Sequence, residues 1–225
     1  INNFDFRYEH YPNPGELISI GAFYKSFKDP IEIYNKITGG NPQFTYQNSP
    51  EAYTMGVEVE FRKSLAGLGV SKFFRNTSIN ANGALIKSEV DIGTDPSTLN
   101  QARFRPLTGQ SPYIINIGTY YNDEVSGFSA NIAYNVFGAR IFTVGDLLYP
   151  TWFEMPRNIL DVQVAKQFKK KYEIKFNVQN LLNANYQFKQ DNTNDSEIQN
   201  SDPLIRGYRV GAQYSISFSI KFNHG

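Results

Sequence analysis

The chain of 225 residues contains no cysteine, two histidines and one tryptophan. Without cysteine it can form neither a disulfide framework nor a thiolate metal site. The two histidines, His10 and His224, lie near opposite ends of the sequence, so neither a Ser-His-Asp arrangement nor a histidine-based metal site is credible within it. We therefore expect no enzyme activity and no cofactor.

Long apolar runs and an excess of one charge are also absent. No run of about 18 apolar residues occurs, which excludes membrane-spanning helices. The 22 basic residues face 21 acidic ones, for a net charge of +1, so nothing electrostatic points to a nucleic-acid partner. The sequence opens at Ile1 with neither Met nor a signal peptide, and we expect Ile1 to be an interior point of a longer polypeptide.

Aromatic residues, by contrast, make up 15% of the chain, and many lie in segments that alternate apolar and polar residues. The clearest segment is 208–222, in which every even position is apolar and every odd position is polar or glycine. Successive side chains of a strand point to opposite faces, so this pattern predicts one long β-strand with an apolar and a polar face. Because about 9 to 11 tilted residues cross a bilayer, the strand is long enough to span a membrane.

The same period of two predicts eight further strands, at residues 4–8, 17–27, 53–62, 77–85, 113–121, 128–136, 160–168 and 172–179. No segment shows a helical period that competes. The connections alternate in length, with long ones at about 28–51, 91–110, 143–155 and 190–206. Short periplasmic turns and long extracellular loops are typical of outer-membrane barrels. The fold class predicted is all-β, a transmembrane antiparallel β-barrel, with the C-terminus on the periplasmic side.

The number of strands is odd, whereas a closed bacterial barrel has an even number. Nine strands that begin at the outer surface therefore predict the C-terminal part of a larger barrel in the cell outer membrane of a Gram-negative bacterium.

Specific motifs accompany this periodicity. The segments are Gly56 to Glu60 (GVEVE), Arg105 to Tyr113 (RPLTGQSPY), Pro156 to Asp161 (PRNILD), Lys175 to Asn183 (KFNVQNLLN) and the last strand ending at Phe222. Together and in this order they make the chain resemble TonB-dependent outer-membrane receptors of the Bacteroidetes kind.

The resemblance implies a barrel of about 22 strands closed by a plug, as in large outer-membrane transporters. Residues 1–225 would supply its last nine strands, while the plug domain and the TonB box lie outside this sequence. The function implied is receptor activity with energy-coupled, TonB-dependent uptake of a scarce solute. The implied partners are outer-membrane lipid, the protein's own N-terminal plug and TonB. A surface lipoprotein is a further partner in systems of this kind, although no residue here indicates it, and none identifies the solute.

Candidate site residues fall into two groups. Loop residues suited to contact a ligand, or to form an interfacial aromatic girdle, are Arg103, Phe104, Arg105, Trp152 and Phe153. Polar-face residues that would face the lumen, and there meet the plug or a solute, are Glu58, Glu60, Arg62, Asp161, Lys175 and Arg209. A weaker calcium hypothesis rests on oxygen ligands at Asp191, Asp195 and Asp202 in a loop that lacks the glycine and flanking helices of an EF-hand.

Two other classes of protein fit parts of the sequence. One is a passive porin or a structural outer-membrane barrel subunit of a larger surface assembly. The other is a soluble β-sandwich, which predicts strands of about 5 residues with turns every 8 to 12 residues. The long strands and the alternation of connection lengths favour the transmembrane barrel.

Overall fold

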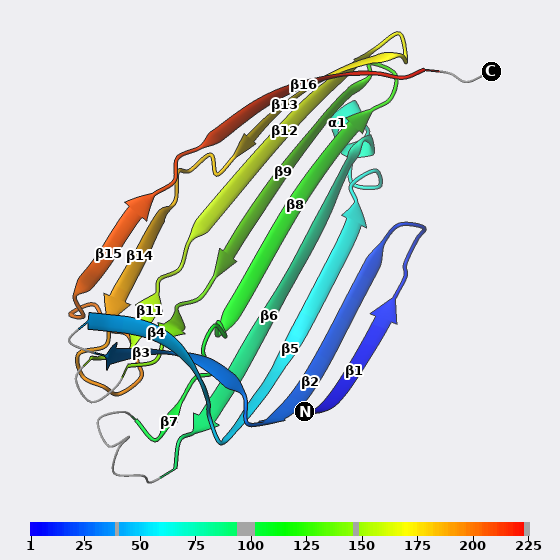
Figure 1. Cartoon of the computed structure of the whole chain (residues 1–225). Coiled ribbons are helices and arrows are strands. Elements are labelled where there is room, and N and C mark those ends of the chain that lie inside the picture. The colour runs from blue at the N-terminus through cyan, green and yellow to red at the C-terminus, as the bar shows by residue number, and fades with distance from the viewer. Residues whose placement is uncertain (39–40, 94–101, 146–148, 223–225) are drawn as a thin grey trace.

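The computed structural model describes residues 1–38, 41–93, 102–145 and 149–222, and its main feature is a long, tilted antiparallel sheet (Figure 1). Nine strands follow one another as direct neighbours in chain order. They are β1 (Asn2–His10), β2 (Leu17–Lys28), β5 (Glu51–Ser64), β6 (Thr77–Asp91), β8 (Tyr113–Asp123), β9 (Phe128–Phe137), β12 (Asn158–Phe168), β13 (Tyr172–Gln179) and β16 (Gln213–Ile220). The all-β prediction with nine long strands is confirmed.

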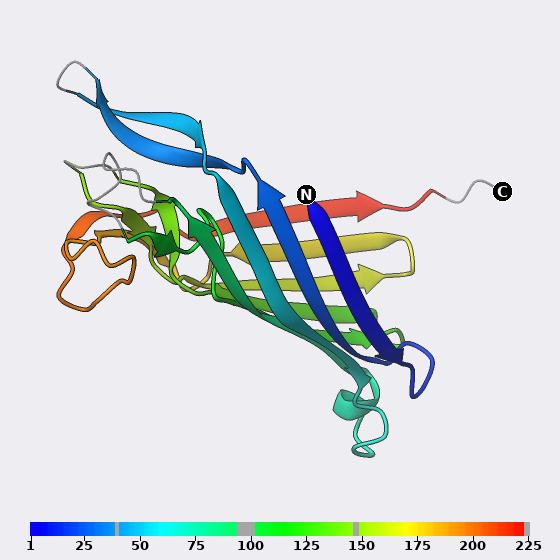
Figure 2. The ribbon, with the colours of Figure 1, turned by 90° about the horizontal axis from the view of Figure 1, so that it is seen from below.

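The sheet is curved and open (Figure 2). Within the described residues, β1 pairs only with β2 and β16 pairs only with β13, so these two strands are its edges. Both run toward the same end of the sheet (Figure 1). Closure into a barrel is not seen in this chain.

Connection length separates the two ends of the sheet, as the sequence predicts. The four short connections lie at one end, and the four long ones gather at the other, at the lower left of Figure 1. The single helix of the described residues, α1 (Lys72–Arg75), lies in a short connection where no helix was expected. No helix in the described part of the chain is long and apolar enough to cross a membrane.

The long connections contain short strands that alternation did not reveal. Two of them, β3 (Ile31–Thr38) and β4 (Asn41–Asn48), form a hairpin, and β7 (Phe104–Arg105) extends the main sheet at β6. A separate four-stranded sheet has the order β10 (Arg140–Thr143), β11 (Trp152–Glu154), β14 (Asn185–Gln190) and β15 (Leu204–Arg209). The end with long connections is therefore folded rather than irregular.

The prediction of one unbroken strand over 208–222 is wrong. Tyr208 belongs to β15 and pairs with Tyr186, whereas β16 begins at Gln213 and pairs with β13. Gly211, between them, has φ of 86°, a left-handed conformation that residues with a Cβ atom rarely adopt. The chain changes sheets at this glycine without changing the apolar-polar alternation, which is why the sequence pattern hides the break.

The two faces of the main sheet differ in chemistry. On one face, apolar side chains such as Val59, Ile117 and Ile132 are about half exposed, at 53%, 44% and 46%. On the other face, Asn116 donates to the Asn82 oxygen at 2.8 Å and accepts from Asn135 at 2.6 Å, which forms an amide ladder across three neighbouring strands. An outward apolar band and a polar interior are the pattern of transmembrane barrels.

Candidate solute-contact site

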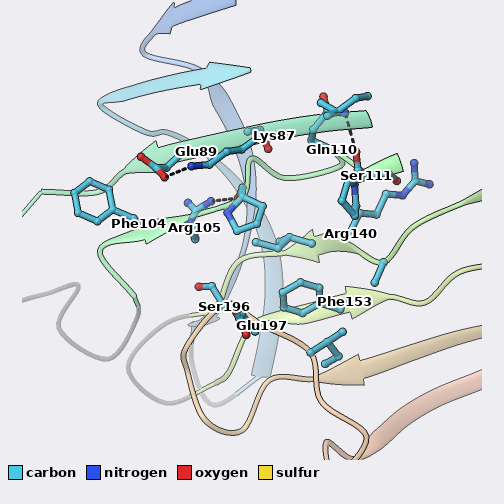
Figure 3. A pocket seen from close by; sticks show the side chains of 17 residues that line it. Lys87, Glu89, Phe104, Arg105, Gln110, Ser111, Arg140, Phe153, Ser196 and Glu197 are labelled. Atoms are coloured by element: carbon cyan, nitrogen blue, oxygen red, sulfur yellow. Dashed lines mark hydrogen bonds and ion pairs between the residues drawn. The ribbon is translucent and has the colours of Figure 1, made fainter. Parts of the chain in front are cut away.

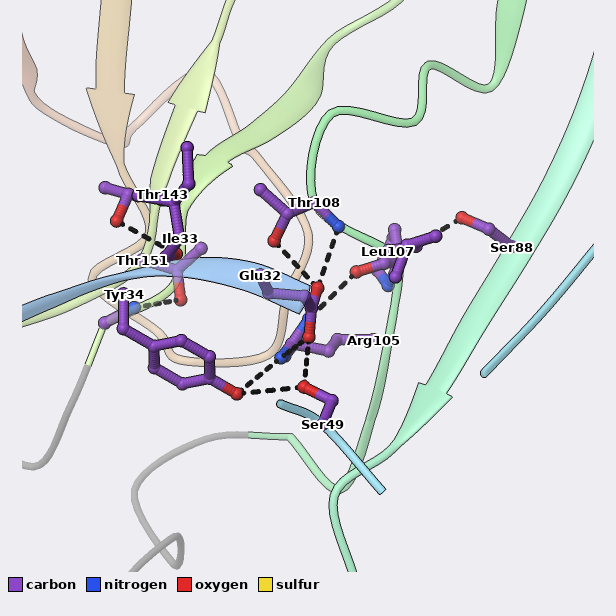
Figure 4. A network of polar contacts seen from close by, with 12 residues as sticks. Glu32, Ile33, Tyr34, Ser49, Ser88, Arg105, Leu107, Thr108, Thr143 and Thr151 are labelled. Atoms are coloured by element: carbon purple, nitrogen blue, oxygen red, sulfur yellow. Dashed lines mark hydrogen bonds and ion pairs between the residues drawn. The ribbon is translucent and has the colours of Figure 1, made fainter. Parts of the chain in front are cut away.

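A buried ion pair joins two of the long connections (Figure 4). Arg105 of β7 donates from Nη1 and Nη2 to the two carboxylate oxygens of Glu32 in β3, at 2.8 and 2.7 Å. Both side chains are fully excluded from solvent. Two parallel bonds match the planar guanidinium to the carboxylate, so the pair fixes β3 against β7 in orientation as well as position.

Three more side chains complete the network around Glu32. Thr108 donates to Glu32 through both its backbone amide, at 2.9 Å, and its hydroxyl, at 2.8 Å. Ser49 donates to the other carboxylate oxygen, and Tyr34 accepts from Arg105 at 3.0 Å. Both oxygens of the buried carboxylate therefore accept hydrogen bonds, as the burial of a charge requires.

This environment perturbs the ionisation of both partners. Burial alone would raise the pKa of Glu32, but the hydrogen bonds and positive charge of Arg105, with Ser49 and Thr108, lower it to about 2. For Arg105, burial acts to lower the pKa, and the carboxylate of Glu32 outweighs it and raises the pKa. The pair is therefore ionised at neutral pH.

The third and fourth long connections join the same assembly through an apolar cluster. Ile141, Val144 and Phe153 are buried, and Tyr34 and Ile198 pack against them. Backbone bonds add to this contact, because Asn35 donates to the Val144 carbonyl at 2.8 Å and Val144 to the Ile33 carbonyl at 2.9 Å. All four long connections thus form one packed unit, which we call the loop assembly.

A cavity of about 510 Å³ opens between β6 and the loop assembly (Figure 3). Its walls are mostly apolar and include Phe104, Phe153 and Ile141. Charged residues also line it, with Lys87 lying 3.7 Å from Glu89. An apolar hollow with a few charged groups is the usual form of a small-molecule site.

The structure gives the five residues predicted as loop contacts different surroundings from one another. Phe104 and Phe153 line the cavity. Arg103 forms a two-point pair with Asp91 at 2.9 Å and lies over the Phe104 ring at 4.9 Å, exposed to solvent. Trp152 packs edge-on against Phe44 with ring centroids 5.9 Å apart.

Arg105 also lines the cavity, but its guanidinium is buried and bonded to Glu32. The structure gives it a role in holding the loop assembly together, and its contact with a solute stays a prediction.

The predicted lumen residues mostly share the polar face of the main sheet. Glu60 pairs with Arg7 at 2.9 Å and with Arg62 at 2.6 Å, and Glu58 lines a nearby hollow that also contains Arg7. Asp161 accepts from the Asn180 amide at 2.8 Å.

Lys175 lies on that face too, 3.6 Å from Glu173. Arg209 is not part of the main sheet, because it belongs to β15 and pairs with Asn185 in the smaller sheet. It therefore does not lie in the last strand, and its lumen-facing role stays a prediction.

The aspartates of the calcium hypothesis accept hydrogen bonds from backbone amides of their own loop. Asp191 accepts from the amides of Asn194 and Ser196 at 2.9 and 2.8 Å, and Asp202 accepts from the Gln199 amide at 2.6 Å. Asp195 accepts from the Glu197 amide at 2.9 Å. Within the described residues, no group of three or more acidic, histidine or cysteine side chains is arranged to hold a metal ion. Calcium binding stays a prediction, and the geometry gives these carboxylates a structural role.

Sequence reasoning missed Glu32, Tyr34, Ser49 and Thr108. Glu32 and Arg105 are 73 residues apart, and no local pattern marks two residues that meet at such a distance. A weak signal existed in the alternation of Ile31, Glu32 and Ile33, which is typical of a strand with one polar face.

The curved sheet, its two chemically different faces and the unequal ends define the wall of an outer-membrane-type β-barrel. Residues 1–181 match the family model of the TonB dependent receptor-like beta-barrel, and the chain belongs to this family. The family consists of transporters rather than enzymes, which agrees with the expectation of no enzyme activity.

Solved structures share the fold. The ferric yersiniabactin uptake receptor FyuA from Yersinia pestis is 18% identical, with 98% of this chain and 30% of that chain covered and a TM-score of 0.63. The copper transporter OprC is 14% identical, with coverage of 98% and 32% and a TM-score of 0.66. This chain thus spans about 30% of the length of the solved proteins it matches. A search of curated proteins found no match.

Proposed function

We propose that the full-length protein is an outer-membrane receptor that imports a scarce solute with energy supplied through TonB. The observation that carries this proposal is the family match over residues 1–181 on a nine-strand sheet with an apolar and a polar face. In this scheme the chain supplies part of the barrel wall and one folded group of loops. The plug and the TonB-contacting segment belong to the rest of the protein.

We further propose that residues 1–225 form the C-terminal segment of that barrel. The two edge strands run in the same direction (Figure 1), so β1 and β16 cannot be antiparallel neighbours of each other. Exposed strand edges are not tolerated in lipid, because their backbone groups would lack partners. Strands from elsewhere in the full-length protein would meet both edges, and the loop assembly would face the outside of the cell.

The cavity beside the loop assembly is the proposed contact site for the solute. Phe104 lines the cavity and is exposed at 51%, so it offers an aromatic ring to a solute there. The two solved proteins named above handle a ferric chelate and copper, which makes metals and metal complexes the first solutes to test.

The test measures cellular iron and copper in cells with and without the full-length receptor, each in the presence and absence of TonB. We expect the receptor to raise the content of its metal only when TonB is present. A receptor-dependent gain that persists without TonB contradicts energy coupling and supports a passive porin instead. A Phe104→Ala variant is expected to lower uptake, whereas Phe44→Ala, in the same assembly but outside the cavity lining, is the matched control.

A further inference from the structure

The connection between β5 and β6 exposes a series of apolar side chains at the short-turn end of the sheet. Leu68 is 66% exposed, Val70 94% and Phe73 57%. Exposing three large apolar side chains of one short turn to water is unfavourable in free energy. We call this group, with Lys72 and Arg75, the turn patch.

The turn patch continues the apolar face of the barrel wall. Phe73 stacks on Tyr121, with ring centroids 6.2 Å apart and an interplanar angle of 18°, and Tyr121 contacts Phe128 at 6.0 Å. Tyr121 lies on the same face as Ile117, because the two are four positions apart in β8. Amphipathic aromatic rings concentrate at the level of the lipid headgroups, so the stack marks where the apolar band ends.

The turn is held in shape from within. A Cβ placed on Gly69 would lie 2.5 Å from a ring carbon of Phe74, so the chain packs closely around that ring. The Asn122 amide donates to the Asn76 carbonyl at 2.9 Å and ties the turn to the next one. Phe74 therefore anchors the turn while Phe73 stays exposed.

The patch carries two positive charges of its own, Lys72 and Arg75. Asp123 and Glu124 of the neighbouring turn line the same hollow as these two cations, and the other short connections contain Lys169, Lys170 and Lys171 against Glu16. Within the described residues neither Lys72 nor Arg75 makes an ion pair. Lys72 has only a longer-range electrostatic interaction with the carboxylate of Asp123. Lys166, on the apolar face, extends along the wall and donates to the Ser126 carbonyl at 2.6 Å, as a cation does when it reaches from lipid toward the interface.

We propose that the turn patch is a membrane anchor that binds anionic phospholipid in the leaflet at the short-turn end. Leu68, Val70 and Phe73 insert among the upper acyl segments, and Lys72 and Arg75 contact phosphate groups. The occupant is lipid rather than protein because the patch is continuous with the lipid-facing wall and carries the complementary charge. The proposal rests on the proposed membrane orientation, in which this end faces the periplasm.

The experiment uses the full-length receptor in vesicles of phosphatidylethanolamine with or without phosphatidylglycerol. This chain has no cysteine. In a full-length receptor with any cysteine elsewhere replaced by serine, Val70→Cys introduces a defined site for an environment-sensitive fluorophore, with Ser201→Cys at the other end as the matched control. We expect a blue-shifted emission at position 70, quenched by bromine-labelled lipid, with stronger quenching when phosphatidylglycerol is present.

Two variants separate the parts of the anchor. Lys72→Gln with Arg75→Gln is expected to abolish the phosphatidylglycerol-dependent increase without affecting folding, and about 1 M salt, where screening acts over ~3 Å, should do the same. Leu68→Ser with Phe73→Ser is expected to remove roughly half or more of the quenching, because it removes most of the buried apolar area.

An emission at position 70 that equals the water-exposed control in both kinds of vesicle overturns the proposal. Shielding that arises only when a periplasmic protein is added overturns it too, in favour of a protein partner. Labelling of Val70→Cys from outside intact cells would instead contradict the proposed orientation, which separates failure of the anchor from failure of the proposed function.

Discussion

Glu32 and Arg105 form a two-point ion pair at 2.7 and 2.8 Å that is fully shielded from water and joins β3 to β7. The pair connects two segments that the sequence pattern alone predicts to be separate loops. It also links them to the apolar cluster around Val144, because Tyr34 contacts both. The stability of the loop assembly should therefore depend on this one contact.

Replacement of Arg105 by Ala should destabilise the loop assembly by about 3–5 kcal/mol, because it leaves the Glu32 carboxylate buried without a counter-charge. The readout is the rate of chymotrypsin cleavage in the long connections of the folded receptor. Arg103→Ala is the matched control: its pair with Asp91 is exposed, and such pairs contribute at most about 1 kcal/mol. Equal effects of the two variants would show that burial of the pair does not matter.

The low pKa of Glu32 predicts a pH dependence of the same assembly. The folded-state value is about 2 against an ordinary value of 4.5, so the folded state binds fewer protons than the unfolded state in that range. The stabilisation is complete above about 4.5 and is lost as the pH falls toward about 2. Pepsin cleavage of the long connections should become faster in the native receptor as the pH falls from about 4.5 toward about 2. The Glu32→Gln variant should not show this increase. A rise that persists in the variant would assign it to other carboxylates.

Neighbouring residues of β12 test which face meets lipid. Val162 shares the apolar face with Ile132, its partner in β9, while Gln163 points to the opposite face beside Asn131. Val162→Arg should cost about 2–4 kcal/mol if the strand crosses the bilayer near its midplane, and Gln163→Arg should cost far less. Urea-dependent folding into vesicles measures both. The reverse order of the two costs would invert the assignment of the faces.

Gly211 should resist substitution more than Gly207. Its φ of 86° is unfavourable for a branched side chain, so Gly211→Val should destabilise the junction of β15 and β16 by roughly 1–2 kcal/mol. At Gly207 an added Cβ would meet its nearest atom at 3.7 Å, an ordinary contact, and Gly207→Val is the control. Thermal unfolding followed by gel mobility compares them; an equal loss in both would point to strand propensity rather than to φ.

The main sheet could be predicted from the sequence because period-two alternation persists over long strands such as β5 and β8. The shorter strands β10 and β11 have 4 and 3 residues, too few for a period to be distinguished from chance. Contacts in the loop assembly also join distant segments, as in the isolated bridge between Tyr34 and Val144. Such pairings depend on packing of the whole chain, which no local window contains.

The candidate site was harder to predict than the sheet for a related reason. Arg105 and Arg103 are alike in sequence, two positions apart among aromatic and polar neighbours. One is buried and the other half exposed. Arg105 lies in β7 and meets Glu32, whereas Arg103 precedes that strand and pairs with the partly exposed Asp91. The residue types indicate a loop region suited to ligand contact, but the structural role of each arginine depends on its burial, which the sequence does not show.

The packing of the four long connections into one loop assembly has a consequence for the thermodynamics of recognition. A solute that meets flexible loops must order them, at an entropic cost of about 1–2 kcal/mol for each residue fixed. Here the Ile141, Val144 and Phe153 cluster and the Glu32 network have already ordered the backbone around the cavity during folding. At the proposed solute site, less of the interaction energy is therefore spent on ordering loops and more of it appears as affinity, which suits capture from dilute solution.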